Sequence, residues 1–426
     1  MLQTLRNAWK IPDLRKKMLY TILMLVIFRL GSFIPVPGID AEMIKQLMGG
    51  FDQGIQGLIN NFSGGALERA SIFAMSITPY INASIILQLL TVAIPALEKL
   101  AKEGEEGRKK IASYTRYVTV ILAFIQATGL FFSLRSAMTG DSGVFAYFVV
   151  TFTFTAGTAF LMWLGEEITE KGVGNGISLI IFAGIVSRLP GMFTSLWAYL
   201  QSGSLNWIGA LALLILAVAV IGVVVTMNEA ERRIPVQYAK RVVGRKMYGG
   251  QSTHIPIKVA AAGVIPIIFA MSIMAFPGTI ASFFGVQPGD KGFWGGFLWV
   301  FSSTSWVYAV LYFLLIIFFT YFYTAIQFNP VEMSNNMKKN GGFIPGIRPG
   351  RPTTDYISRV LSRITLAGAV FLGVIAVLPI FMNLGLHISN FAIGGTSILI
   401  VVGVALETVK DLESQMLMRH YKGFLE

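Results

Sequence analysis

Long runs without charged side chains dominate this sequence. Residues 70–97 form one such run, with no Asp, Glu, Lys or Arg before Glu98. About 20 apolar residues suffice for a helix to cross a bilayer. Directly before this run, residues 54–67 (GIQGLINNFSGGAL) are helix-like but too short to cross, and Asn and Gly residues interrupt them. Because non-helical backbone persists at membrane depth only inside protein or beside a water-filled cavity, this pair of segments predicts the inside of a pathway.

The composition indicates a multi-spanning membrane protein. Apolar residues make up 54% of the chain and charged residues 13%, whereas soluble domains carry roughly 25% charged residues. The absence of cysteine excludes disulfides, thiolate metal sites and a cysteine nucleophile. Residues 1–18 lack the short apolar core and cleavage site of a removable signal peptide.

Apolar runs and the turn residues between them predict ten spans, five on each side of residue 200. They are expected at residues 19–34, 72–94, 117–136, 145–164, 174–196, 207–227, 259–284, 300–323, 364–381 and 391–409. Five is an odd number, so a second five-span unit starts from the opposite face of the membrane. If residues 1–200 and 201–426 are structural repeats, they must therefore be inverted, as in many transport proteins.

Basic residues alternate between the connections and predict the orientation. The N-terminal tail and the connections after spans 2, 6 and 8 hold five to seven Lys or Arg residues each. The other connections hold two at most, among them Lys171 after span 4. Because cytoplasmic loops carry the excess of Lys and Arg, both termini are expected in the cytoplasm.

The sequence offers no pattern for catalysis, for a metal ion or for a cofactor. It lacks a His-Glu-x-x-His motif, and the glycine-rich stretch 172–176 (GVGNG) lacks the Lys-Ser/Thr of a phosphate loop, so a helix entrance is the favoured interpretation. Arg29 lies inside a span, while Glu166 and Glu407 lie at span ends. The lack of buried carboxylates counts against a proton-coupled carrier. The lack of catalytic groups counts against an intramembrane enzyme.

An apolar lining of the passage is the remaining possibility. Ile77 and Ile81 are four residues apart and share one helix face. Packing against lipid or core explains this spacing most simply; alternatively, an apolar constriction excludes ions by dewetting. The roles of Asn82 and Gln88 are equally open, because interhelical hydrogen bonds explain many polar residues in spans.

Six strings in order along the chain are highly specific. They are 34–40 (IPVPGID), 76–90 (SITPYINASIILQLL), 163–178 (WLGEEITEKGVGNGIS), 251–258 (QSTHIPIK), 262–266 (AGVIP) and 346–350 (GIRPG). These strings resemble the SecY family, the channel-forming subunits of the bacterial Sec protein translocase. The resemblance extends from one tail to the other and includes all ten predicted spans.

The resemblance implies an all-α polytopic protein in which two inverted five-helix halves surround an hourglass pore that also opens sideways into lipid. The implied pore ring is Ile77, Ile81, Ile181, Ile268 and Ile400. The implied plug, at about 54–67, includes Ile55, Leu58, Asn60, Asn61, Phe62, Gly64 and Gly65. The implied lateral gate between spans 2 and 7 includes Thr78, Asn82, Ile85, Gln88, Ile265, Ile268 and Ser272.

Two basic connections, at about 229–258 and 329–363, are longer than orientation requires. Retention of positive charge on the inner side explains their charge most simply; alternatively, a projecting cationic loop attracts ribosomal RNA phosphates and acidic protein surfaces. The resemblance favours the second interpretation, with docking of the SecA ATPase or the ribosome. The expected docking residues are Arg232, Arg233, Lys240, Arg241, Arg245, Lys246 and Arg348.

The expected function is a non-enzymatic channel, in the bacterial plasma membrane, for unfolded secretory polypeptides. The resemblance implies SecE, SecG, SecA, the ribosome, a preprotein with its signal sequence and membrane lipids as partners. With no nucleotide motif in the chain, energy must come from SecA, translation or the membrane potential. Two other classes stay open: a small-solute transporter, which needs an intramembrane charge or coordinating group, and a membrane-embedded enzyme or scaffold.

Overall fold

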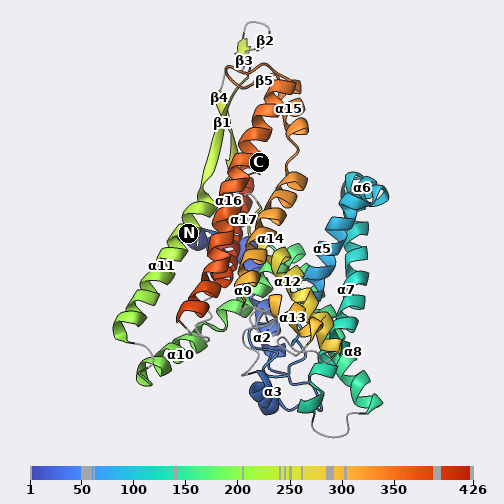
Figure 1. Cartoon of the computed structure of the whole chain (residues 1–426). Helices are drawn as coiled ribbons and strands as arrows, with labels where there is room; N and C mark the ends of the chain where they lie inside the picture. The colour runs from blue at the N-terminus through green and yellow to red at the C-terminus, as the bar shows by residue number, and fades with distance from the viewer. Residues whose placement is uncertain are drawn as a thin grey trace.

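The protein is mostly helical in a computed structural model of the chain (Figure 1). The structure describes residues 2–48, 60, 63–138, 143–203, 206–238, 241–243, 246–248, 252–260, 262–284, 292–301, 305–386 and 395–422. Up to residue 201, the helices are α1 (Leu2–Lys10), α2 (Pro12–Gly31), α3 (Ala41–Met48), α5 (Thr78–Ala93), α6 (Pro95–Lys102), α7 (Glu105–Ser133), the short η1 (Arg135–Ala137), α8 (Val144–Lys171), α9 (Gly176–Val186) and α10 (Leu189–Gln201).

The second part of the chain adds long helices and five short strands. The helices are α11 (Trp207–Glu229), α12 (Ile265–Phe284), α13 (Phe293–Val300), α14 (Trp306–Gln327), α15 (Pro330–Lys339), α16 (Arg351–Leu386) and α17 (Gly395–Lys422). The strands are β1 (Glu231–Tyr238), β2 (Arg241–Val243), β3 (Lys246–Tyr248), β4 (Ser252–Lys258) and β5 (Gly342–Phe343).

Each predicted span overlaps a helix or a pair of helices in the described part of the chain, but the spans expected at 72–94, 259–284 and 300–323 begin six residues before their helices α5, α12 and α14. Within it, six helices are long and apolar enough to cross a membrane, or seven if the bent pair α5 and α6 counts as one. The two helices of that pair meet at an angle of 101°. Pro95 explains the bend, because a residue before proline avoids helical geometry and Ile94 is extended (φ −107°, ψ 112°). The total of ten crossings stays a prediction.

The predicted span 72–94 is wrong over its first turn and a half, because α5 begins only at Thr78. Pro79 occupies the first turn of this helix, where its missing N–H leaves no broken hydrogen bond. Just before it, Ser76 has a left-handed backbone (φ +53°), which a helix cannot accommodate. Residues 71–77 therefore cross this part of the interior as turns.

The two long basic connections are not plain loops. Strands β4, β1 and β5 form one sheet, in which β1 pairs antiparallel with β4 from Glu231↔Lys258 and with β5 at Gln237↔Phe343. Along β1, the buried Ile234 and Val236 alternate with exposed residues, as expected for a strand with one covered face. We call β1, β4, β5, α15, the connection 344–350 and the first turns of α16 the strand unit, which projects from one end of the helices (Figure 1).

The strand unit has its own apolar core, separate from that of the long helices. Its buried members are Ile234, Val236, Ile257, Met337, Ile344, Ile357 and Leu361. They come from both connections, so residues more than 100 positions apart share one core. The two predicted docking connections are therefore a single packed body.

We predict that Ile234→Ala loosens the strand unit without disturbing the long helices. Removing a fully buried isoleucine costs about 3 kcal/mol through lost packing and a residual cavity. Hydrogen exchange of the β1 and β4 amides should accelerate, while exchange in α7 and α8 stays unchanged. Arg233→Ala is the matched control, because Arg233 is exposed on the same strand. Unchanged exchange in β1 and β4 would contradict this core.

Candidate functional site

A buried segment that is not helical lies among the long helices. We call Asn60 and residues 63–77 the interior segment; its described residues from 63 to 77 form turns. Asn60, Ser63, Ser71 and Ser76 are buried polar residues of this segment. Irregular backbone of this kind survives at membrane depth only when protein covers it and satisfies its hydrogen bonds.

Neighbouring elements supply those hydrogen bonds. The N–H of Val36 donates to the Ala70 carbonyl (2.8 Å), and the N–H of Ile72 donates to the Ile34 carbonyl (3.0 Å). On the other side, helix α8 approaches the segment at Gly157, where a Cβ would lie 2.0 Å from the Ile72 carbonyl oxygen. Glycine is therefore required at position 157 for α8 to pack against the segment.

An arginine inside a predicted span holds the first turn of the segment. The Arg29 guanidinium on α2 donates from Nη1 to the Gly64 carbonyl (3.0 Å). Gly64 has φ +66°, and a Cβ there would lie 2.5 Å from the Ser187 hydroxyl. Arg29 and Arg69 also lie over the Phe33 ring, at 4.8 and 4.5 Å from its centroid. Arg29 therefore has a structural partner within the protein instead of reaching for the membrane surface.

Glu68 joins Asn60, the first residue of the segment, to the connection between α9 and α10. Its Oε1 accepts a short hydrogen bond from the Asn60 side chain and lies 3.4 Å from Nη2 of Arg188, between α9 and α10. Because charged hydrogen bonds are stronger than neutral ones, this carboxylate, like the Arg29 guanidinium, is a polar anchor of the segment. Sequence reasoning missed Glu68 and Arg188; isolated charges beside long apolar runs were the available signal.

The predicted plug residues are only partly within the described chain. Asn60, Gly64 and Gly65 belong to the interior segment, whereas Ile55, Leu58, Asn61 and Phe62 lie outside the described residues. The expectation of a helix-like segment is wrong for residues 63–67, which form turns. Positive φ values at Gly64 and Gly65 (+66° and +81°) explain the difference, since they interrupt helical geometry.

The structure places the five predicted ring residues in one apolar cluster. Ile77 caps the start of α5, Ile81 lies one turn later, Ile181 is on α9 and Ile400 is on α17; all four are buried members of this cluster. Ile268 on α12 is half-buried and packs against the same cluster. The cluster therefore draws side chains from elements distant in sequence into the region next to the interior segment.

The predicted gate residues lie on two helices that are in contact, α5 and α12; α12 also contacts α7. Ile85 is buried in the same apolar cluster, Asn82 is half-buried and Gln88 is exposed. On the α12 side, Ile265, Ile268 and Ser272 are half-buried. Thr78, in the first turn of α5, has a buried hydroxyl.

The predicted docking residues lie on the strand unit and beyond it. Arg232, Arg233 and Arg348 are exposed, and Arg233 pairs with Glu231 (2.7 Å). Arg241 and Lys246 lie on the paired strands β2 and β3 at the tip. Lys240 and Arg245 are outside the described residues.

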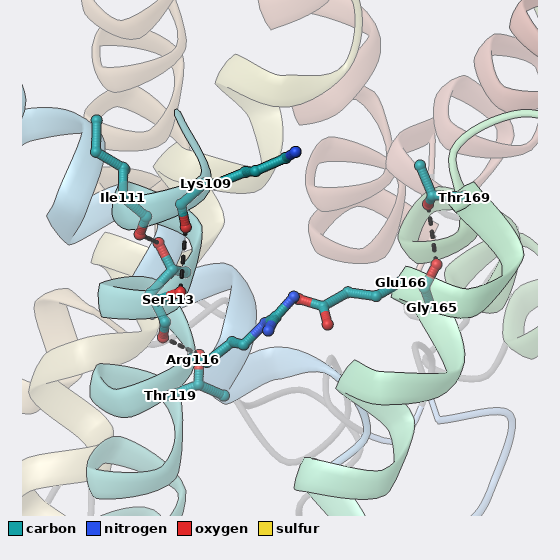
Figure 2. A network of polar contacts seen from close by, with 9 residues as sticks. Lys109, Ile111, Ser113, Arg116, Thr119, Gly165, Glu166 and Thr169 are labelled. Carbon is teal, nitrogen blue, oxygen red and sulfur yellow. Dashed lines mark hydrogen bonds and ion pairs between the residues drawn. The ribbon is translucent and has the colours of Figure 1, made fainter. Parts of the chain in front are cut away.

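An ion pair joins α7 to α8 (Figure 2). Arg116 on α7 donates from Nε to Oε1 of Glu166 on α8, at 2.8 Å. Figure 2 shows the two side chains extended toward one another across the gap between these helices. In the part of the chain that the structure describes, no group of three or more His, Asp or Glu residues could hold a metal ion.

The fold and the site together define a multi-spanning helical membrane protein whose interior holds a non-helical segment beside an apolar cluster. The family model of SecY matches residues 71–409. Protein translocase subunits SecY from Streptomyces galbus and Bacillus subtilis (strain 168) are each 48% identical to this chain, over 445 and 442 residues, with 100% of both chains covered. This chain therefore belongs to the SecY family, as the sequence resemblance predicted.

Solved structures show the same fold. One described as a protein-conducting channel has a TM-score of 0.66 at 21% identity and covers 95% of this chain and 93% of its own. A SecY structure described through its plug domain has a TM-score of 0.65 at 20% identity, with 95% and 92% coverage. Canine Sec61 in a ribosome–channel complex has a TM-score of 0.62 at 20% identity, with 95% and 93% coverage. The family also agrees with the expectation of a non-enzymatic protein.

We predict that Glu68→Ala loosens the interior segment. A single introduced cysteine can report on this loosening, because the chain has no cysteine of its own. Ser63→Cys places the thiol at a fully buried position of the segment. Loss of a charged hydrogen bond should accelerate labelling of this thiol by a water-soluble reagent about tenfold. Glu105→Ala is the matched control, since Glu105 forms an exposed ion pair with Lys109. Equal labelling in both backgrounds would show that Glu68 does not anchor the segment.

Proposed function

We propose that this chain is a protein-conducting channel, which moves unfolded secretory polypeptides across the plasma membrane and releases apolar helices sideways into lipid. The interior segment is the observation that carries this proposal: buried, irregular backbone lies beside an apolar cluster drawn from both parts of the chain. Membership of the SecY family supports it. In the proposal, α1–α10 and α11–α17 are two inverted halves, and both termini are cytoplasmic.

The resting channel is closed by apolar packing. Ile77, Ile81, Ile181, Ile268 and Ile400 form the constriction, and the interior segment with the rest of the plug fills the passage beside it. An apolar constriction blocks ions by dewetting. Isoleucine makes no directional bonds, so such a ring suits substrates of any sequence.

Opening is a competition between closed and open arrangements. A partner on the strand unit and an apolar signal helix between α5 and α12 both favour the open state. Neither can shift the equilibrium by more than its own preference for that state. The contacts of Arg29 and Glu68 instead favour the closed state, because they hold the interior segment in its closed position.

The docking partners are SecA and the translating ribosome, and the small subunits SecE and SecG complete the complex. Canine Sec61 and yeast Ssh1, which share this fold and were solved with ribosomes, support the ribosome as a partner. The exposed Arg232, Arg233 and Arg348 provide positive charge on the strand unit. Arginine suits this role because its planar guanidinium makes several hydrogen bonds to a phosphate or carboxylate at once.

We predict that glycine at Ile81 and Ile181 makes the resting channel leak ions. Removing two buried apolar side chains opens the constriction to water. The measurement is ion conductance of the reconstituted complex without substrate. Ile86→Gly is the control, because Ile86 lies on the same helix but is exposed, so it tests the cost of glycine in α5 alone. Conductance equal to that of the control would remove the ring from the mechanism.

A second prediction tests docking. Arg348→Glu should reduce SecA- and ribosome-dependent transport of a preprotein into liposomes by about tenfold or more, because a contact between opposite charges becomes a repulsive one. Lys110→Glu is the matched control: it makes the same charge change at an exposed residue of a different basic connection. If both variants transport at the wild-type rate, Arg348 is not a docking residue.

A further inference from the structure

The glycine-rich loop between α8 and α9, residues 172–176, is bound by side chains from three helices. The N–H of Val173 donates to Thr21 Oγ1 on α2 (3.1 Å), and the N–H of Gly176 donates to Thr169 Oγ1 on α8 (2.9 Å). The N–H of Gly174 donates to Asp411 Oδ2 on α17 (3.0 Å). This last bond joins the first part of the chain to the last helix.

The loop needs its glycines to make these contacts. Gly174 has φ +72°, a conformation that other residues adopt only with strain. A Cβ at Gly176 would lie 2.0 Å from the carbonyl oxygen of Gly165 on α8. Figure 2 shows Gly165 one turn before Thr169, which binds the loop from the same helix. The stretch that resembles a phosphate loop in sequence is therefore a packing loop.

One stripe of α17 makes the contact from the other side. Thr408, Asp411, Leu412, Gln415 and Met416 follow the spacing of a single helix face. Gln415 donates to Asp411 Oδ2 (3.0 Å) and accepts from Lys17 Nζ on α2 (3.2 Å).

Apolar packing extends the same contact. Leu412 is buried in a small cluster with Ala8, Leu14 and Val173, and Met416 packs against it. Beyond this cluster, Thr4 on α1 donates to Glu413 (2.9 Å). We call the contact of α1, α2 and the 172–176 loop with this stripe and with Glu413 the α17 joint.

The other long contact between the two parts of the chain has a different character. In α12, the helix that meets α5 and α7, the buried side chains are apolar, among them Ile267, Ala270 and Met271. Apolar packing has no preferred direction and re-forms easily between new partners. The directional hydrogen bonds of the α17 joint instead hold one geometry.

The α17 joint also lies at the base of two proposed ring helices. Ile181 follows Gly176 by five residues along α9, which is about 7.5 Å, and Ile400 precedes Asp411 by eleven residues along α17, about 16 Å. Any shift of Asp411 against the loop therefore changes the spacing of these two isoleucines.

We propose that Asp411 is a positioning residue of the channel: the α17 joint stays closed and serves as the pivot when α12 separates from α5 and α7. This inference rests on the proposed function. It assigns a role to the 172–176 loop, and it predicts that the two parts of the chain rotate about one contact without coming apart.

The test uses an added bridge across the joint. Thr4→Cys with Glu413→Cys, in a chain without other cysteines, can be joined by a short, cleavable reagent with two thiol-reactive groups, because these two side chains are in contact. The complex is reconstituted in liposomes, and both preprotein transport and resting ion conductance are measured before and after bridging. The bridged channel should transport within about twofold of the unbridged one, because a pivot does not open.

Asp411→Ala should raise resting conductance about tenfold, since Gly174 loses its charged acceptor. Bridging positions 4 and 413 in that variant should bring the conductance back to near the wild-type value. General misfolding would not be rescued by the bridge. Asp411→Asn, which keeps an oxygen acceptor, should remain close to wild type.

Two results would overturn the pivot: loss of transport on bridging with recovery on cleavage, or wild-type conductance in Asp411→Ala. If Asp411→Ala raises the conductance and bridging does not lower it again, the pivot is also refuted. Failure of the unbridged, otherwise unaltered channel to transport would instead refute the proposed function, so the two failures are distinguishable.

Discussion

The need to bury irregular backbone at membrane depth governs this structure. Residues 63–77 are not helical, so their N–H and C=O groups need partners that a helix would have supplied itself. The residues after α2 supply two of these bonds, and α8 can lie close enough to cover the segment only because position 157 is glycine. The positions of α2 and α8 therefore follow from the requirements of one short segment.

Polar and apolar contacts have separate tasks around this segment. The hydrogen bond from Arg29 to Gly64 and the ion pair of Arg188 with Glu68 hold it at defined positions. The surrounding cluster of isoleucines and other apolar side chains excludes water without specifying geometry. The buried hydroxyls of Ser71 and Thr78 have no protein partner in the described part of the chain, which limits how stable this arrangement can be. A channel of this kind needs such a balance, because it must both seal and open.

The sequence predicted the long helices well because hydropathy reports directly on membrane burial. The family resemblance supplied the predicted ring residues, which lie in one apolar cluster; their spacing alone left packing against lipid or core as the simpler interpretation. The start of α5 was missed because it depends on the backbone conformation of Ser76. The Glu68–Arg188 pair was missed because it joins residues 120 positions apart, and no local pattern encodes such a contact.

The strand unit is more than a pair of loops, and this changes how the proposed docking would act on the membrane helices. Because β1 pairs with β4 and β5 over a shared core, a partner bound at Arg348 moves the same body as one bound at Arg232. At the base of the sheet, the N–H of Val259 donates to the Ala230 carbonyl (2.9 Å), and α16 packs against Val259 at Gly368. Helix α12 begins six residues after Val259. Under the proposed function, docking at either connection therefore acts through the base of the sheet on α12, the helix whose contact with α5 and α7 has to part.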